Sequence, residues 1–553
     1  MTSTQQPHLR RWLNGTIVLG AAAIAAISPA SAFAQEKTDY FDETTATSIF
    51  AFDDSAIPFT HNLKLEMRTP EKHAANPVVP RGGDGDPDNW AVQFYGSVVK
   101  VEGKYRMWYC AAGRRSGQQG AANQVGSDIS FWRIAYAESD DGVKWTKPDL
   151  GLVEYNGNTD NNLVKIDPQN VSMLNVKVIH DPEDPDPSRR YKMTGHAYWT
   201  KEAPAGSRTL GTLVVFTSPD GLNWKSLTGV NPKKNAFLTK DDVLLEDTHF
   251  EPCGGLYKWD GLYYISGQNA VSAARPYHGR VSRAYVSGDF ANWERASNIQ
   301  FVRTAQHTLL GSGRSREGEQ NHEGISVWNR GNMLMGVYGM WHGAKEWPGV
   351  TIDLGFVISN DGVTFREPMH EWPLIKIGKD GEWDQGGLLQ GQGFENVGDQ
   401  TYIYYGAWDP RQWETAPVRG GVGIVTVPRD RLGALTPDPT TVGDSVYKIQ
   451  TLVCDLVTGP IKVKTDAASN LYLNVDGLGD NATLKVELFD HTLKPLPAYS
   501  GDNAAIVKQS GFQTPVVFGG KEAAEGLPER IRAKITFEGD NMTDIRFSAL
   551  YIK

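Results

Sequence analysis

Two glutamates each come directly before an apolar run that is typical of a β-strand. Glu251 stands in Phe250-Glu-Pro-Cys-Gly-Gly-Leu-Tyr257, and Glu323 stands in His322-Glu-Gly-Ile-Ser-Val-Trp328. Two carboxyl groups at one site can divide acid and base work, because their surroundings keep one protonated and the other ionised. Cleavage of a glycosidic bond uses such a pair. We therefore expect both side chains to project into one site.

Several further side chains are suited to sugar hydroxyls or sugar faces: His249, His322, Gln392, Trp90 and Trp341. His249 and His322 come just before the glutamates, and Gln392 holds the matching place before a later strand. Each has a structural alternative, because a histidine can bond to the backbone and a tryptophan can pack in the core. Asp88 lies upstream of the first predicted strand and is either a further catalytic acid or part of a solvated turn.

The elements that must position these residues recur along the chain. A hairpin of the type Ser-x-Asp-Gly-x-x-Trp follows a β-forming run four times, roughly 70 residues apart. The copies are Ser139–Trp145, Ser218–Trp224, Ser287–Trp293 and Ser359–Phe365. In three copies Asp-Gly supplies a tight turn. Recurrence in phase predicts one repeated supersecondary unit.

A second pattern alternates with this hairpin: a strand, a turn mostly rich in Gly or Asp, and an apolar or aromatic strand. Its copies lie at residues 98–109, 176–193, 255–264, 325–334 and 394–404. Five units of four strands, with helical periodicity nearly absent, are typical of propeller blades. The sequence therefore predicts an all-β fold that contains a five-bladed β-propeller.

The composition changes after the last repeat. Every tryptophan except Trp12 lies between Trp90 and Trp413, and from about residue 445 alternating strands are separated by Gly, Asp and Asn turns. This pattern predicts a C-terminal β-sandwich of common domain size. The predicted organisation is a signal peptide at 1–34, a catalytic propeller at 35–440 and a sandwich at 445–553.

The N-terminal segment predicts export. Arg10 and Arg11 precede an apolar run at 17–27, and Ala32-Phe-Ala34 follows. A basic region, a short apolar core and an A-x-A site are typical of a secretory signal peptide, and the run is too short to span ~30 Å of hydrocarbon. We predict cleavage after Ala34 and a periplasmic or secreted protein with no membrane contact after cleavage.

The charge and the cysteine content limit the classes of partner and of site that are expected. The chain has 55 Lys and Arg against 65 Asp and Glu, a net charge of −10, and no basic block. Phosphate neutralisation needs clustered cations, so a carbohydrate is expected as partner rather than a nucleic acid. Three cysteines, without CxxC, HExxH or a histidine cluster, predict neither a disulfide framework nor a metal site. No cofactor is expected.

The five repeats and the following sandwich resemble glycoside hydrolase families 32, 43 and 68, and are most similar to uncharacterised bacterial homologues of family 32. The resemblance covers about residues 50 to 550 at the level of architecture. It implies carboxylates at the inner ends of the first strands of blades one to three. It also implies hydrolysis of a terminal furanoside or pyranoside.

Individual residues follow this resemblance in part. Glu251-Pro-Cys matches the family 32 motif Glu-Cys-Pro with the last two residues exchanged, which implies that Glu251 is the general acid. By strand phase, Asn175 stands where the family has a transition-state-stabilising aspartate. The blade-one motif Trp-Met-Asn-Asp-Pro-Asn-Gly is absent, and Asp88 lies near its place. Glu323 or Asp88 is then the expected base or nucleophile.

Together these observations predict an exported glycosidase that cleaves terminal bonds of a plant or algal polysaccharide or oligosaccharide in the propeller funnel. Because acids are missing at two of three family positions, a carbohydrate-binding propeller without catalysis is an alternative. A sialidase-like enzyme and a glycoside phosphorylase on the same fold are two further alternatives.

Overall fold

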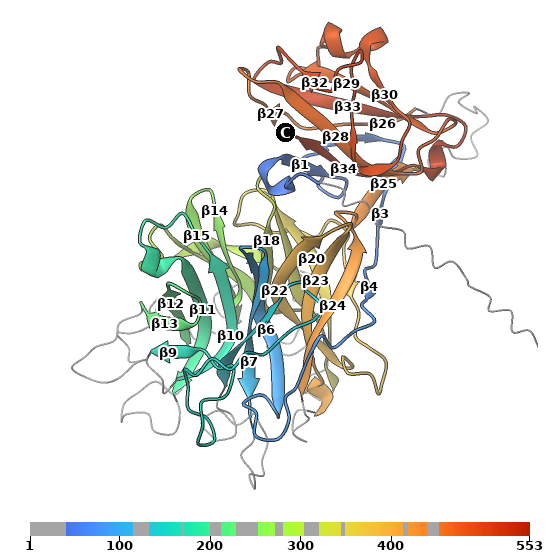
Figure 1. The fold of residues 1–553 in the computed structure, drawn as a ribbon. Coiled ribbons are helices and arrows are strands. Elements are labelled where there is room, and N and C mark those ends of the chain that lie inside the picture. Colours follow the sequence, from blue (N-terminus) through green and yellow to red (C-terminus); the bar gives the residue numbers. More distant parts are fainter. Residues whose placement is uncertain are drawn as a thin grey trace, which may run out of the picture. The chain divides into compact units, whose positions relative to one another are not determined.

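A computed structural model describes residues 40–113, 132–167, 171–199, 212–227, 253–270, 280–303, 320–343, 349–412, 419–438 and 453–553. Within these ranges the regular structure consists of β-strands and short 3-10 helices, with no α-helix (Figure 1). The predicted all-β class is therefore confirmed. A search of the same ranges finds no helix with the length and apolar character needed to cross a bilayer.

Five groups of antiparallel strands form the blades. Blade 1 contains β6 (Ala91–Val101), β7 (Lys104–Ala112) and β8 (Arg133–Ser139). Blade 2 contains β10 (Val171–His180), β11 (Tyr191–Trp199), β12 (Thr212–Ser218) and β13 (Asn223–Ser226), with β9 (Lys165–Asp167) parallel to β13. Blade 3 contains β14 (Cys253–Trp259), β15 (Leu262–Ala270), β16 (Arg280–Ser287) and β17 (Glu294–Phe301). Blade 4 contains β18 (Gln320–Asn329), β19 (Leu334–His342), β20 (Thr351–Ser359) and β21 (Pro373–Ile375). Blade 5 contains β22 (Gly387–Val397), β23 (Gln400–Trp408) and β24 (Arg419–Pro428).

The innermost strands of the blades close into a ring. β6, β10, β14, β18 and β22 contact one another in this order, and β22 returns to β6. Two short strands from an earlier part of the chain, β4 (Glu71–Lys72) and β5 (Val79–Pro80), pair with β24 and complete blade 5. The predicted five-bladed propeller is therefore confirmed. Its last blade is completed by strands from an early segment of the chain.

The four repeated hairpins have the hydrogen bonds that their sequences predict. In the first copy, Gly142 N donates to Ser139 Oγ at 2.9 Å, Lys144 N donates to Asp141 Oδ1 at 2.7 Å, and Trp145 Nε1 donates to Gly142 O at 3.0 Å. Gly142 has φ 77°, a conformation that glycine adopts without strain. The third copy has Phe290 at this place, with φ 64°.

These hairpins also join neighbouring blades. The carbonyl of the turn glycine accepts a hydrogen bond from an aromatic side chain of the preceding blade in three places. The pairs are Tyr404 to Gly142 at 2.8 Å, Trp108 to Gly221 at 2.7 Å and Tyr257 to Gly362 at 2.8 Å. All three donors are buried, so the bonds satisfy polar groups inside the blade interfaces. This gives the repeated motif a structural role in spacing the blades.

Two further sheets face each other as a β-sandwich. One contains β3 (Leu63–Met67), β25 (Gly433–Pro437), β34 (Arg546–Ile552), β28 (Ser469–Asp476) and β31 (Gly511–Pro515), with β1 (Thr47–Phe50) on β34 and β32 (Ala523–Ala524) on β28. The other contains β2 (Phe59–His61), β26 (Cys454–Val457), β33 (Arg530–Glu538), β29 (Thr483–Asp490) and β30 (Ala505–Val507), with β27 (Ile461–Lys462) on β33. The 3-10 helices are η1 (Glu43–Thr45), η2 (Pro187–Arg189), η5 (Pro410–Gln412), η7 (Pro497–Tyr499), η8 (Gly501–Asn503) and η9 (Met542–Asp544).

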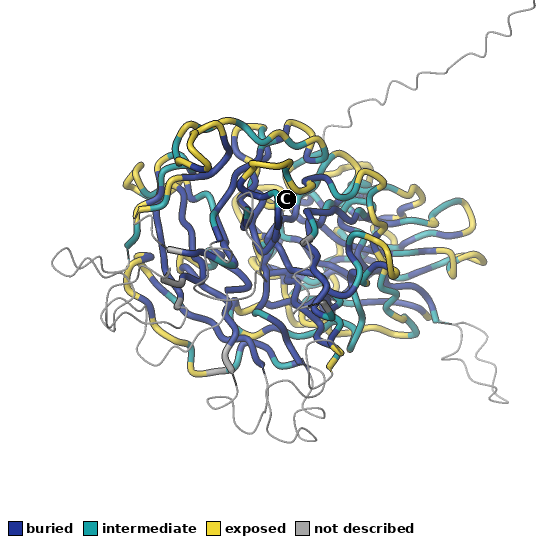
Figure 2. The backbone as a smooth tube through the Cα atoms, turned by 90° about the horizontal axis from the view of Figure 1, so that it is seen from below, coloured by how far each residue is buried: buried dark blue, intermediate teal, exposed yellow. Residues whose placement is uncertain are grey.

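Burial distinguishes the two parts. In β33 buried residues alternate strictly with more exposed ones, as in a strand that covers a core with one face. In β6 the first eight residues are all buried, because an inner strand is enclosed on both faces. Figure 2 shows buried backbone along many strands and exposed backbone at many turns.

The domain boundary differs from the one expected from the sequence. We predicted a propeller at 35–440 and a sandwich at 445–553, but β1, β2, β3 and β25 all pair with sandwich strands. The propeller strands thus run from β4 to β24. Short strands do not specify their pairing partners locally, so the sequence could not show where these four belong. The predicted signal peptide at 1–34 lies outside the described residues.

Candidate active site

Every innermost strand of the propeller contains a β-bulge in its first half or its middle. The register against the second strand shifts between Gln93 and Ser97, Leu174 and Lys177, Cys253 and Gly255, His322 and Ile325, and Gln390 and Phe394. A bulge interrupts the ladder and re-aims side chains, and bulges are frequent next to active sites. The five bulges therefore mark the segments of the inner strands where functional side chains are expected.

Two of these bulges contain a non-glycine residue in the left-handed region. Asn175 has φ 56° and Glu323 has φ 63°, and Gly324 follows with φ 78°. Asparagine tolerates this conformation, whereas glutamate adopts it at a cost of about 1–2 kcal/mol. Such strain persists only where surrounding contacts hold it, and it is concentrated at functional sites.

The two residues in this conformation meet across the ring. Asn175 Nδ2 donates a hydrogen bond to Glu323 Oε2 at 2.8 Å. Asn175 belongs to blade 2 and Glu323 to blade 4, which are not neighbours, so the bond crosses the middle of the propeller. Asn175 is buried, and the Glu323 side chain keeps 14% of its surface exposed. Glu323 is therefore a partly accessible carboxylate at the centre of the ring.

His322 approaches the other oxygen of this carboxylate, with Nε2 3.5 Å from Glu323 Oε1. Burial, together with the charge of Arg280, holds the pKa of His322 well below its usual range, so its ring is neutral. The Tyr95 hydroxyl lies 3.3 Å from Nδ1. A neutral imidazole has one donor and one acceptor, and in the tautomer that accepts from Tyr95 at Nδ1 the Nε2 hydrogen is directed at Glu323. N–H groups facing both oxygens favour the ionised carboxylate.

Blade 3 holds the backbone of Glu323. Its amide donates to Gln268 Oε1 at 2.8 Å, and the same oxygen accepts from Arg280 at 3.2 Å. The Arg280 guanidinium lies over Trp341, 4.8 Å from the ring centroid. Trp341 is fully buried and also packs against His322, so its described contacts are with protein side chains. Sugar binding by Trp341 and His322 stays a prediction.

The structure places Gln392 against the backbone of blade 3. Its Oε1 accepts from Leu256 N at 3.0 Å, and its Nε2 donates to Leu256 O at 2.7 Å. Blades 5 and 3 are not neighbours, so this pair of bonds also crosses the ring. Both ends of the amide tie blades together, and sugar binding by Gln392 stays a prediction.

Asp88 is buried and forms an ion pair with the partly exposed Lys147. Its Oδ2 accepts from Lys147 Nζ at 2.6 Å and from the Tyr109 hydroxyl at 2.7 Å, and its Oδ1 accepts from Gly82 N at 3.1 Å. Trp90 is also buried, in a core shared by blades 1 and 2. These contacts favour a structural role for both side chains, while the catalytic role of Asp88 and sugar stacking by Trp90 stay predictions.

The predicted acid Glu251 and its companion His249 lie outside the described residues. The strand that follows them, β14, begins at Cys253, whose thiol donates to the Asn175 carbonyl at 2.6 Å. The roles of Glu251 and His249 therefore stay predictions.

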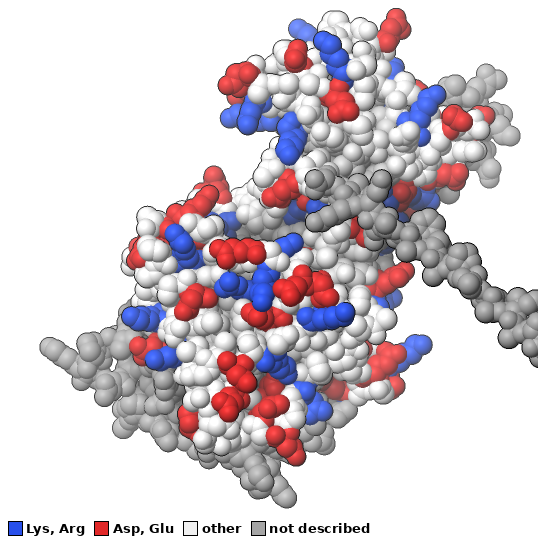
Figure 3. All heavy atoms as spheres, in the orientation of Figure 1, with Lys and Arg blue, Asp and Glu red and all other residues white. Residues whose placement is uncertain are grey.

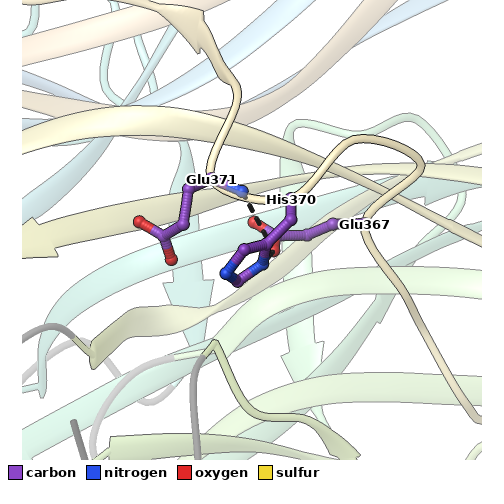
Figure 4. Close-up of side chains that lie close together, drawn as sticks. All are labelled: Glu367, His370 and Glu371. Atoms are coloured by element: carbon purple, nitrogen blue, oxygen red, sulfur yellow. Dashed lines mark hydrogen bonds and ion pairs between the residues drawn. The ribbon is translucent and has the colours of Figure 1, made fainter. Parts of the chain in front are cut away.

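Among the described residues, Glu367, His370 and Glu371 could offer ligand atoms to one metal ion (Figure 4). Their own contacts occupy these atoms. Glu367 bonds to the Tyr338 hydroxyl, to His370 and to the Glu371 amide, and Arg303 forms two hydrogen bonds with the Glu371 carboxylate. These contacts hold the loop that contains Glu367, His370 and Glu371 in place.

Four residues of the network around Glu323 were not predicted from the sequence: Tyr95, Lys177, Gln268 and Arg280. Lys177 had the clearest signal, because it is the one charged residue in the apolar run Met173-Leu-Asn-Val-Lys-Val-Ile179. The other three give no signal in sequence, since their roles depend on contacts with Glu323 and His322 from other blades.

Charge on the surface gives no further site on the face shown in Figure 3. Acidic and basic side chains are interspersed there, and neither sign covers a continuous area.

No protein-family model matches the sequence, and no curated protein matches it. Solved structures give weak matches. A structure described as showing that the GH130 family of mannoside phosphorylases contains hydrolases of β-1,2-mannosidic linkages in Candida mannan is 16% identical, with TM-score 0.40, over 66% of this chain and 95% of that chain. A glycosyl hydrolase from Bacteroides ovatus is 15% identical, with TM-score 0.40 and the same coverage of both chains. A β-1,2-mannobiose phosphorylase from Listeria innocua, in complex with β-1,2-mannobiose, is 11% identical, with TM-score 0.42, over 66% of this chain and 97% of that chain. These values are too low to assign a family or an activity, so the resemblance to families 32, 43 and 68 stays a prediction.

Proposed function

We propose that this protein is an exported glycosidase in which Glu323 is the base or nucleophile. One observation carries the proposal: the Glu323 carboxylate sits at the centre of the ring, with Asn175 donating to one oxygen and His322 facing the other. An ionised, partly exposed carboxylate in this place suits either attack on an anomeric carbon or activation of water.

The proton donor is a second residue, because one carboxyl cannot be ionised and protonated at the same step. We assign this role to Glu251, on its residue type and its place before β14. The proposed substrates are terminal residues of plant or algal polysaccharides or oligosaccharides.

A second candidate function is glycan binding without catalysis. The amide of Asn175 favours it, because an amide stands where the resembling families have an acid and its donor is already used by Glu323. Such a protein would bind a glycan saturably and release no sugar from it.

The test is a screen of the purified full chain against aryl glycosides and against plant, algal and mannose-containing glycans. Each assay is run with and without inorganic phosphate, and both free sugar and sugar phosphate are measured. Glu323→Gln and Glu251→Ala are assayed in parallel. Glu395→Gln is the control, because Glu395 follows the bulge of inner strand β22 and its described electrostatic partner is Lys100 on β6.

Wild type should release free sugar without phosphate. Glu323→Gln and Glu251→Ala should each lose about 10²–10⁴-fold in rate while staying folded, and Glu395→Gln should keep the wild-type rate. Full activity in folded Glu323→Gln would overturn the assignment of the base. Sugar phosphate formed only with phosphate would identify a phosphorylase, and binding without release would favour the second candidate.

A further inference from the structure

A lysine is buried in the middle of the propeller, two residues after Asn175 in the chain. Lys177 follows Asn175 by two residues in β10 and has no exposed surface. Its ammonium donates to Tyr95 O at 2.5 Å and to Gln390 O at 3.2 Å. These carbonyls belong to blades 1 and 5. Blades 2 and 5 are not neighbours, so the lysine side chain runs through the centre of the ring.

Gln390 carries this contact on to Glu323. Its Nε2 donates to His322 O at 2.5 Å and to Gly324 O at 3.3 Å, which are the carbonyls on either side of Glu323. Lys177 therefore holds the backbone of Gln390, and Gln390 holds both flanks of the Glu323 bulge. Strained backbone persists only where surrounding contacts hold it, and these hydrogen bonds hold Glu323 in its left-handed conformation.

Lys177 also brings a positive charge into the buried centre of the propeller. Buried charges are costly unless an opposite charge or well-aligned hydrogen bonds compensate them. Among described residues, Glu323, Cys110 and Cys253 interact electrostatically with Lys177, and the Lys177 ammonium lies 5.6 Å from the centroid of the Tyr95 ring. Burial raises the pKa of the Cys110 thiol to about 11 and that of Cys253 to about 12, so both are neutral. Glu323 is then the negative charge that faces Lys177.

We propose that Lys177 is a positioning residue of the candidate site, which ties three blades together beneath the bulges and supplies the positive charge that keeps Glu323 ionised and in place. The proposal rests on the proposed function for its meaning in catalysis. Its physical content, a coupling between Lys177 and Glu323, is independent of which reaction occurs. Burial lowers the pKa of Lys177 to about 8, so the lysine should lose its positive charge above that pH.

The test is a double-mutant cycle on the full chain. Thermal unfolding is measured for wild type, Lys177→Met, Glu323→Gln and the double variant. Lys192→Met, alone and with Glu323→Gln, is the matched control. The Lys192 side chain is equally buried, on the next strand of the same blade, but is paired with Asp181 and Asp184. If Lys177→Met does not fold, Lys177→Gln replaces it in the cycle, because glutamine keeps N–H donors without the charge.

Lys177→Met and Glu323→Gln should be coupled, so that the double variant loses less melting temperature than the two single losses added together. Lys192→Met and Glu323→Gln should be additive. If wild type is active, Lys177→Gln should also move the acid limb of the pH–rate profile upward by about one unit, whereas Lys192→Met should leave it in place.

Additive losses for Lys177 and Glu323 would overturn the inference, even if the enzyme cleaves glycans. Coupling in a protein that cleaves no glycan would retain the placement of the charge and refute the proposed reaction. The two failures are therefore distinguishable.

Discussion

Asn175 and Glu323 lie 148 residues apart in the chain and share a 2.8 Å hydrogen bond across the middle of the propeller. Both have positive φ, both lie in bulges of inner strands, and each is anchored by other blades. The bond explains why an amide suits position 175. An amide donates to an ionised carboxylate, whereas a second carboxylate would repel it or take up a shared proton.

Asn175→Asp should therefore weaken Glu323 as a base. Two carboxyl groups at this distance titrate as a pair that retains one proton toward neutral pH. On whichever glycoside wild type cleaves, kcat/KM at pH 7 should fall by about tenfold or more, with the acid limb of the profile moved upward by about one unit. Asn175→Ala removes the donor without adding an acid, and it should move the limb less. Equal profiles for the two variants would show that charge at position 175 does not matter.

Asp88 and Lys147 form an ion pair in which Asp88 is buried and the Lys147 side chain is 26% exposed, so removing the two partners should have unequal effects. Lys147→Met should lower the free energy of unfolding by about 3–5 kcal/mol, because the Asp88 carboxylate is left buried without its partner. Asp88→Asn should lower it less, because the Lys147 ammonium can reach water. Both should keep turnover at temperatures where they remain folded. The measurements are chemical denaturation and initial rates on the same preparations. Loss of turnover in folded Asp88→Asn alone would instead support Asp88 as a catalytic acid.

Glu395 should make the protein less stable as pH rises. Burial raises its pKa to about 7, against an opposing effect of Lys100. The folded state then holds a proton that the unfolded state releases near pH 4.5, so stability is fully present below that value. It falls as pH rises toward about 7 and stays lower above it.

Glu395→Gln should remove this dependence. It should match wild type near pH 4.5 and exceed it at pH 8 by roughly 2–4 kcal/mol in free energy of unfolding. Glu183→Gln, at an exposed side chain, is the control and should change neither value. A difference between Glu395→Gln and wild type that is constant over pH 4.5 to 8 would contradict the prediction.

The sequence was sufficient for the parts of this protein that depend on local order. The repeated Ser-x-Asp-Gly-x-x-Trp hairpins and the strand pairs between them predicted five blades, and both the blades and the hairpin hydrogen bonds are present. Alternating patterns and tight turns involve residues a few positions apart, so a sequence shows them directly. The position of Glu323 just before the apolar run Ile325–Trp328 was visible for the same reason, although the structure places Glu323 inside β18 and not before it.

Only the tertiary structure decided which residues meet. β1 to β3 belong to the sandwich, although they come before the propeller in the chain, because their pairing partners lie several hundred residues away. Lys177 reaches Gln390, Gln392 reaches Leu256, and Asn175 reaches Glu323 across a ring whose closure brings distant strands together. The bulges arise from register against a neighbouring strand, and the cross-ring bonds arise from closure. Neither is a property of any short segment, so the network around Glu323 required the folded ring.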